Sequence, residues 1–170
     1  MIHMVERFKT LKVYEWIIIV IALIINLFIL VNAFIPAGPS TSESNWIVEP
    51  IKEVTNAIKP NTINETNIGT VSSVVRKLVG HFSLFLVSGV FTSLSLIYIR
   101  KELYEKLWLF FVFSCSFGLF LAILTEIIQL FIPGRSGEIG DVLIDFSGYL
   151  VALIIIFIIL FIKKKNTRVK

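Results

Sequence analysis

The sequence predicts an all-α fold: a four-helix transmembrane bundle with a polar outer connection that carries a short amphipathic helix. The first observation is composition, because 56% of the 170 residues are hydrophobic, only 16% are charged, and the mean hydropathy is +0.86. A soluble domain averages about 45–50% apolar and about 25% charged residues, so this excess requires a bilayer as its solvent. The second observation is that the apolar residues gather in four runs of bilayer length. We therefore expect a single membrane domain over residues 1–170.

The four predicted spans cover residues 16–35, 78–99, 107–132 and 139–162. The first run is longer than the roughly 7–15 apolar residues of a signal peptide, and no A-x-A cleavage pattern follows it, so we expect it to be retained. A charged turn at 100–106 joins the second span to the third. Pro133 and Gly134 break the helix before the fourth span, and a basic tail begins at Lys163.

A polar connection, residues 36–75, separates the first span from the second and is rich in Ser, Thr and Asn. Within it, Ile51, Val54 and Ile58 recur at helical spacing, and Pro50 suits the first position of a helix. We expect a short helix over 50–59 that lies on the membrane surface or caps the bundle.

The basic residues predict the orientation. Most of the 16 Lys and Arg residues lie in the N-terminal segment, the 100–106 turn and the C-terminal tail. The positive-inside rule then places both termini in the cytoplasm, with the 36–75 connection and the 133–138 turn outside the cytoplasmic membrane. The pI near 9.3 reflects these anchoring charges, so the lipid bilayer is the expected partner and nucleic acid is excluded.

Polar and ionisable side chains gather at the outer ends of three predicted spans. Lys77 and His81 stand four residues apart, as do Asp141 and Asp145, and Glu126 and Gln129 stand three apart. The members of each pair therefore share one helical face. Such groups are costly inside a membrane and usually face a bundle interior or a water-filled cavity. The residues of this predicted functional cluster are Lys77, His81, Glu126, Gln129, Arg135, Asp141 and Asp145.

The chemistry of this cluster is constrained by its carboxylates, which cannot all ionise close together without partners. We expect Arg135 to pair with Glu126 or Asp141, and either a retained proton or a bound cation to offset the remaining charge. No cofactor is identified, but a divalent metal is an alternative, with His81, Glu126, Asp141 and Asp145 as its candidate ligands. Small residues at the start of the fourth span are expected to allow close helix approach. They are Gly137, Gly140 and Gly148.

The motifs around these residues resemble the VanZ-like family, named for an accessory teicoplanin-resistance protein. The matching residues are Lys77, His81 and Phe82, then Glu126, Gln129, Phe131, Pro133 and Arg135, then Asp141 and Gly148. Three positions depart from the family pattern: Asp145, usually Asn; Phe85, commonly Tyr; and Ala152, a Gly position. The resemblance implies a bacterial cytoplasmic-membrane protein of the cell envelope, linked to reduced sensitivity to teicoplanin-type lipoglycopeptides.

Three functions are compatible with the cluster. The first is binding of a lipid headgroup, a lipid-linked envelope component or a lipophilic antibiotic, with Arg135, Lys77 and His81 meeting phosphate or carboxylate. The second is an intramembrane, metal-dependent enzyme acting on an envelope lipid. It is less favoured because no protease or phosphatase signature is present and Cys115 lies away from the cluster. The third is a charge network that only holds the bundle together. No catalytic residue or oligomeric state is assigned.

Overall fold

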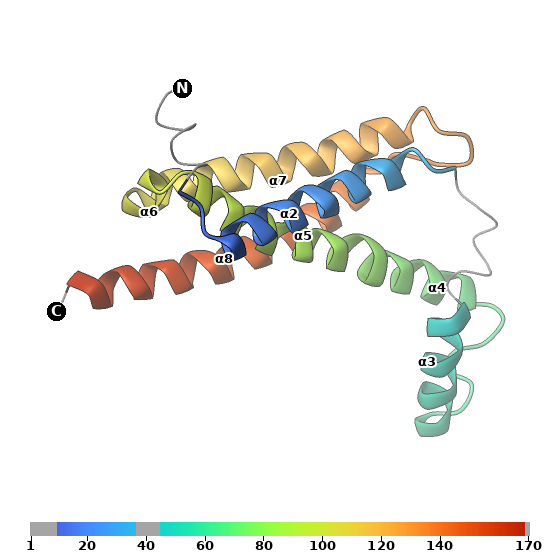
Figure 1. Cartoon of the computed structure of the whole chain (residues 1–170). Helices are drawn as coiled ribbons and strands as arrows, with labels where there is room; N and C mark the ends of the chain where they lie inside the picture. The colour runs from blue at the N-terminus through green and yellow to red at the C-terminus, as the bar shows by residue number, and fades with distance from the viewer. Residues whose placement is uncertain (1–9, 37–44, 169–170) are drawn as a thin grey trace.

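The computed structural model describes residues 10–36 and 45–168, and every element within them is a helix. Four helices are long and apolar enough to cross a membrane, as predicted: Val13–Ala33, Ile68–Ile99, Leu107–Gln129 and Ile139–Thr167. Figure 1 shows them running along one common direction. The elements in chain order are α2 (Val13–Ala33), α3 (Asn45–Ile58), α4 (Ile68–Arg76), the π-helix η1 (Lys77–Phe82), α5 (Ser83–Ile99), α6 (Glu102–Glu105), α7 (Leu107–Gln129) and α8 (Ile139–Arg168).

The spanning helices are apolar on nearly every side, which is the pattern of helices whose neighbours are lipid as well as protein. On α2, Leu23 and Leu27 are exposed, whereas Ile19 and Ile29 are buried against the bundle. In the apolar 18-residue segment of each span, at most 33% of the residues are buried inside the protein. A large lipid-facing surface is therefore available around the bundle.

The span boundaries differ from the predicted ones, for local reasons. The first helix begins at Val13 rather than residue 16, because the Glu15 carboxylate accepts a hydrogen bond from the Lys12 N–H and satisfies a free donor there. The second begins at Ile68, since α4, η1 and α5 are continuous. The third ends at Gln129, and the fourth continues into the basic tail, where Lys164 donates to the Tyr104 carbonyl.

The helix of the polar connection is longer than predicted and begins earlier. Pro50 lies inside α3 instead of at its first position, so the predicted start was wrong; its missing N–H removes one helical hydrogen bond. Ile51, Val54 and Ile58 are in the helix and exposed, while Val48 is buried. Figure 1 shows α3 set across the direction of the spans, at the end where α7 connects to α8.

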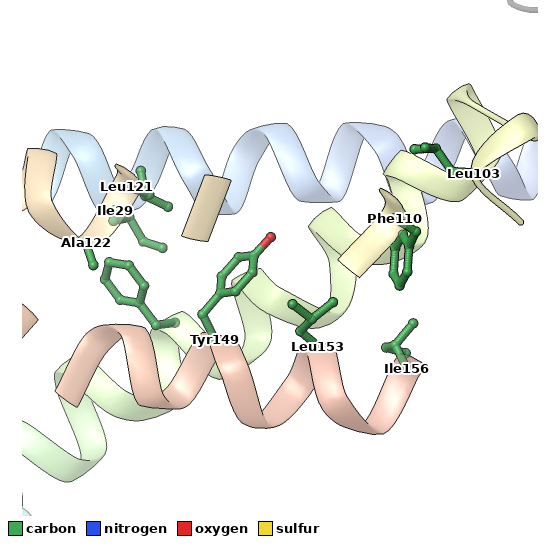
Figure 2. Packing of buried hydrophobic residues seen from close by; sticks show 9 residues of the cluster. Ile29, Leu103, Phe110, Leu121, Ala122, Tyr149, Leu153 and Ile156 are labelled. Carbon is green, nitrogen blue, oxygen red and sulfur yellow. The ribbon is translucent and has the colours of Figure 1, made fainter. Parts of the chain in front are cut away.

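The core of the bundle is centred on Tyr149 of α8, which is fully buried. Its ring packs against Gly118, where a Cβ would fall 2.3 Å from Tyr149 Cδ1. Figure 2 shows Tyr149, Leu153 and Ile156 pointing from α8 into the bundle. The other buried members of this core are Ile29, Phe85, Leu103, Phe110, Leu121 and Ala122.

Hydroxyl and amide groups buried in the bundle are paired, as a lipid environment requires. The Ser114 hydroxyl lies 2.9 Å from that of Ser93 and 3.1 Å from that of Tyr149. The Asn26 amide donates to Thr92 Oγ1 at 2.9 Å and accepts from Ser88 at 2.8 Å. These bonds connect α2, α5, α7 and α8, and so fix how the spans are rotated against one another.

Candidate functional site

Two ion pairs connect η1 to the first turns of α8. Lys77 Nζ contacts Asp141 Oδ1, and His81 Nδ1 lies 3.1 Å from Asp145 Oδ1. Lys77 and His81 stand four residues apart in η1, and Asp141 and Asp145 stand four residues apart in α8. Because the second and fourth spans run in the same direction, the two side chains of one helix meet the two of the other in matching order. The sequence-predicted residues Lys77, His81, Asp141 and Asp145 therefore meet in space.

The close packing of α8 on η1 depends on Gly148. A Cβ at this position would lie 2.2 Å from the Phe82 carbonyl oxygen, so the expected close helix approach is confirmed here. The expectation was wrong for Gly140, which has no neighbouring atom within 4 Å of a built Cβ. A Cβ at Gly137 would lie 2.6 Å from the Glu126 carbonyl oxygen, so this glycine allows the close approach of the turn to α7 rather than the packing of one helix on another. η1, which carries Lys77 and His81, is a π-helical segment between α4 and α5. Single π-helical turns inside α-helices are frequently found at functional sites.

Glu126 reaches the same place from the end of α7. Its carboxylate is buried, with 4% of the residue exposed, and accepts hydrogen bonds from the Glu138 backbone N–H at 3.0 Å and from Gln129 Nε2 at 3.2 Å. Glu138 directly precedes α8, and its carbonyl accepts the first helical hydrogen bond from Asp141. Glu126 thus caps the N-terminus of α8, where a negative charge is favourable.

Three of these side chains, from three elements, converge on one point. His81 of η1, Glu126 of α7 and Asp141 of α8 each offer one ligand atom, and these atoms all lie within 4.8 Å of one another. Glu126 and Asp141 are buried and His81 is partly buried. Within residues 10–36 and 45–168, these three form the group that could hold a metal ion. Asp145, also a candidate from the sequence, is bonded to His81 instead.

Arg135 is engaged elsewhere, so the predicted pairing with Glu126 or Asp141 was wrong. Its Nε donates to the Ile35 carbonyl at 2.9 Å and its Nη2 to the Asn32 carbonyl at 3.5 Å. The last carbonyls of a helix have no intrahelical partner, and a cation is favourable there. Arg135 therefore ties the α7–α8 turn to the last turn of α2 and to Ile35 just after that helix.

Glu138 is a neighbour of the cluster that the sequence analysis missed. It is exposed, and its Oε2 lies 2.9 Å from Lys77 Nζ. The hydrogen bond from the Lys77 ammonium lowers the pKa of the Glu138 carboxyl. Its position three residues before Asp141 was the available signal. We call Lys77, His81, Glu126, Glu138, Asp141 and Asp145 the polar cluster; its carboxylates outnumber its cations.

The comparison with known proteins finds one relevant family. A family model described as VanZ/LLP1 matches residues 16–161, a range that includes every residue of the polar cluster. No curated protein matches the chain, and no solved structure does.

Proposed function

The chain belongs to the VanZ/LLP1 family, and from that premise we propose that it is a bacterial cell-envelope membrane protein that binds the polar headgroup of an envelope lipid or lipid-linked component. The polar cluster is the proposed binding site. One observation carries the proposal: three spanning helices bring His81, Glu126 and Asp141 together within 4.8 Å. Ionisable groups at such positions in a membrane protein are usually functional.

The location of the polar cluster suits a headgroup rather than an acyl chain. Glu126 lies near the end of the third span and Asp141 near the start of the fourth, beside the turn that joins α7 to α8. The ion pair between Lys77 and Asp141 brings the second span to the same level. The distribution of basic residues favours the outer leaflet for this end. A lipid headgroup could then approach from the leaflet without leaving the membrane.

The charges of the polar cluster narrow the mode of binding. The sequence suggested that Arg135 would meet a phosphate directly, but its guanidinium is bonded to α2. Lys77 is held by Asp141 and Glu138. With carboxylates in excess, the site favours a positively charged group, so a phosphate would need a cation between it and the protein.

Reduced sensitivity to teicoplanin-type lipoglycopeptides is the cellular outcome that the VanZ-like resemblance implies. By binding a headgroup or a lipid-linked component, this protein would change the surface that a lipophilic antibiotic contacts at the outer leaflet. An alternative form of this proposal is that the polar cluster binds the antibiotic itself, at the same depth in the membrane.

The direct test is lipid retention. Purified full-length protein is mixed with phosphatidylglycerol and phosphatidylethanolamine, and bound lipid is measured by native mass spectrometry. We expect Glu126→Gln and Asp141→Asn to lose most of the bound lipid that the wild type retains. Glu65→Gln, an exposed carboxylate outside the cluster, is the matched control. Equal retention by all four proteins would contradict the proposal.

The cellular test is growth in teicoplanin of cells that carry the wild type, Glu126→Gln, Arg135→Lys or Asp141→Asn, with membrane levels checked. Wild-type cells should tolerate more antibiotic than cells with the two carboxylate variants. If all four behave alike, the polar cluster has no role in resistance.

A second candidate is an intramembrane enzyme acting on an envelope lipid. The observation in its favour is the His81–Asp145 pair at 3.1 Å, since a carboxylate that orients an imidazole is a common arrangement for a general base. Incubation with the same lipids and mass analysis of the products decides the matter, because a binding protein returns each lipid unchanged.

A further inference from the structure

We propose that His81, Glu126 and Asp141 form a binding site for one divalent transition-metal ion, with Zn²⁺ best matched to the donors. An imidazole nitrogen and two carboxylate oxygens suit Zn²⁺ and, less well, Mn²⁺. Zinc sites with three protein ligands of this kind keep a fourth position open for water or another ligand.

The spacing of the ligand atoms fits such a site. Around a tetrahedral ion with bonds of about 2.0–2.2 Å, ligand atoms stand about 3.3–3.6 Å apart. The three ligand atoms here already lie within 4.8 Å of one another. Small rotations of side chains from three separate helices would close that difference, without a change in the fold.

A supporting set of hydrogen bonds holds two of the three ligands in place. Asp145 Oδ1 is 3.1 Å from His81 Nδ1, which orients the ring and leaves Nε2 for the ion. Glu126 is fixed by the Glu138 N–H and by Gln129. Carboxylate–histidine–metal arrangements of this type are typical of metal centres. This gives Asp145 and Gln129 a role as supports of the ligands rather than as ligands.

Lys77 marks where positive charge is stabilised. Asp141 Oδ1 is buried and accepts no hydrogen bond of good geometry, and its charged neighbour is the Lys77 ammonium. A metal ion would therefore replace this ammonium beside Asp141. Lys77 would keep its ion pair with Glu138, at the exposed side of the cluster. Metal and Lys77 thus compete for one carboxylate.

The proposal also supplies the cation that the headgroup hypothesis needs, and in that respect alone it rests on the proposed function. A phosphate oxygen of the headgroup would occupy the open position of the ion. Metal binding by the protein itself does not depend on a lipid.

The test uses full-length protein in detergent, stripped with EDTA and titrated with Zn²⁺ by calorimetry, with metal content measured by elemental analysis. We expect one ion per chain. Glu126→Gln and Asp141→Asn should bind at least tenfold more weakly, and Asp145→Leu, which removes the acceptor for His81 Nδ1, should weaken binding by about 10–100-fold, the usual effect of removing a supporting group. Glu65→Gln is the matched control and should bind as the wild type does. Thermal unfolding confirms that each variant is folded.

The Lys77→Met variant separates a metal site from a purely structural charge network. Removal of the competing ammonium should tighten Zn²⁺ binding by about tenfold, because a like charge is removed from a buried site. Unchanged or weaker binding by folded Lys77→Met, or no uptake by folded wild type, would overturn the proposal. Lipid retention measured with and without EDTA distinguishes the two proposals: if the protein takes up Zn²⁺ but retains no lipid even with the ion bound, the metal site stands and the headgroup proposal is contradicted.

Discussion

At the scale of single residues, the surroundings of each carboxylate assign it a different role. Glu126 is held by an N–H donor at the start of α8, Asp141 by an ammonium, and Asp145 by an imidazole. The exposed Glu138 shares the ammonium of Lys77. Spacing along the sequence predicted that most of these groups would meet, but it did not distinguish their partners.

The His81–Asp145 pair gives a prediction at this scale. Asp145→Asn retains an oxygen that can accept from His81 Nδ1, so the free energy of unfolding should change by less than about 1 kcal/mol. Asp145→Leu leaves the partly buried imidazole N–H of His81 without this acceptor and should cost about 1–3 kcal/mol. Thermal and denaturant unfolding in one detergent measure both variants. Equal losses would show that His81 does not need this acceptor.

At the scale of helices, the contact between α8 and η1 depends on the missing side chain at Gly148. Gly148→Ala would place a methyl group 2.2 Å from the Phe82 carbonyl oxygen, which is backbone and cannot move aside cheaply. We expect a loss of at least about 1–3 kcal/mol in stability, and disruption of both η1–α8 ion pairs.

Gly140 provides the matched control, because it lies in the same helix with open space around its Cβ direction. Gly140→Ala should be neutral or stabilise the protein by about 0.5–1 kcal/mol, since alanine favours helix over the unfolded chain. Comparison of the two variants by thermal unfolding checks the packing argument. A Gly148→Ala protein as stable as Gly140→Ala would refute it.

The attachment of the α7–α8 turn to α2 gives a second prediction about elements. Arg135→Gln removes the cation from the Asn32 carbonyl in the last turn of α2 and from the Ile35 carbonyl just after that helix, and it should destabilise the protein by about 1 kcal/mol. The value is modest because the site is partly exposed. Arg135→Lys should retain part of that stability. Unfolding midpoints of the three proteins test the order, and a tie between Arg135→Gln and wild type would contradict it.

At the scale of the whole molecule, the distribution of basic residues predicts which end of the bundle faces outward. In a Cys115→Ser background, Ser136→Cys should react with an impermeant maleimide added to intact cells, because it lies in the exposed turn at the polar end. Lys101→Cys, in the exposed turn at the opposite end, should react only after lysis. The reverse pattern would invert the proposed orientation; the native bases Arg7 and Lys9 that contribute to it lie outside the described residues.

The sequence by itself determined the all-α class, the four spans and the level at which polar residues gather, because apolar length and charge placement along a helix are one-dimensional properties. It also predicted which face each i, i+4 pair would share. Only the tertiary structure decided that Arg135 binds α2, that Glu138 joins Lys77, and that His81, Glu126 and Asp141 form the compact group. Those partners depend on how each helix is rotated about its axis and on the path of the turn after α7. Both are set by packing between distant segments, at Gly148 and around Tyr149, which no local pattern encodes.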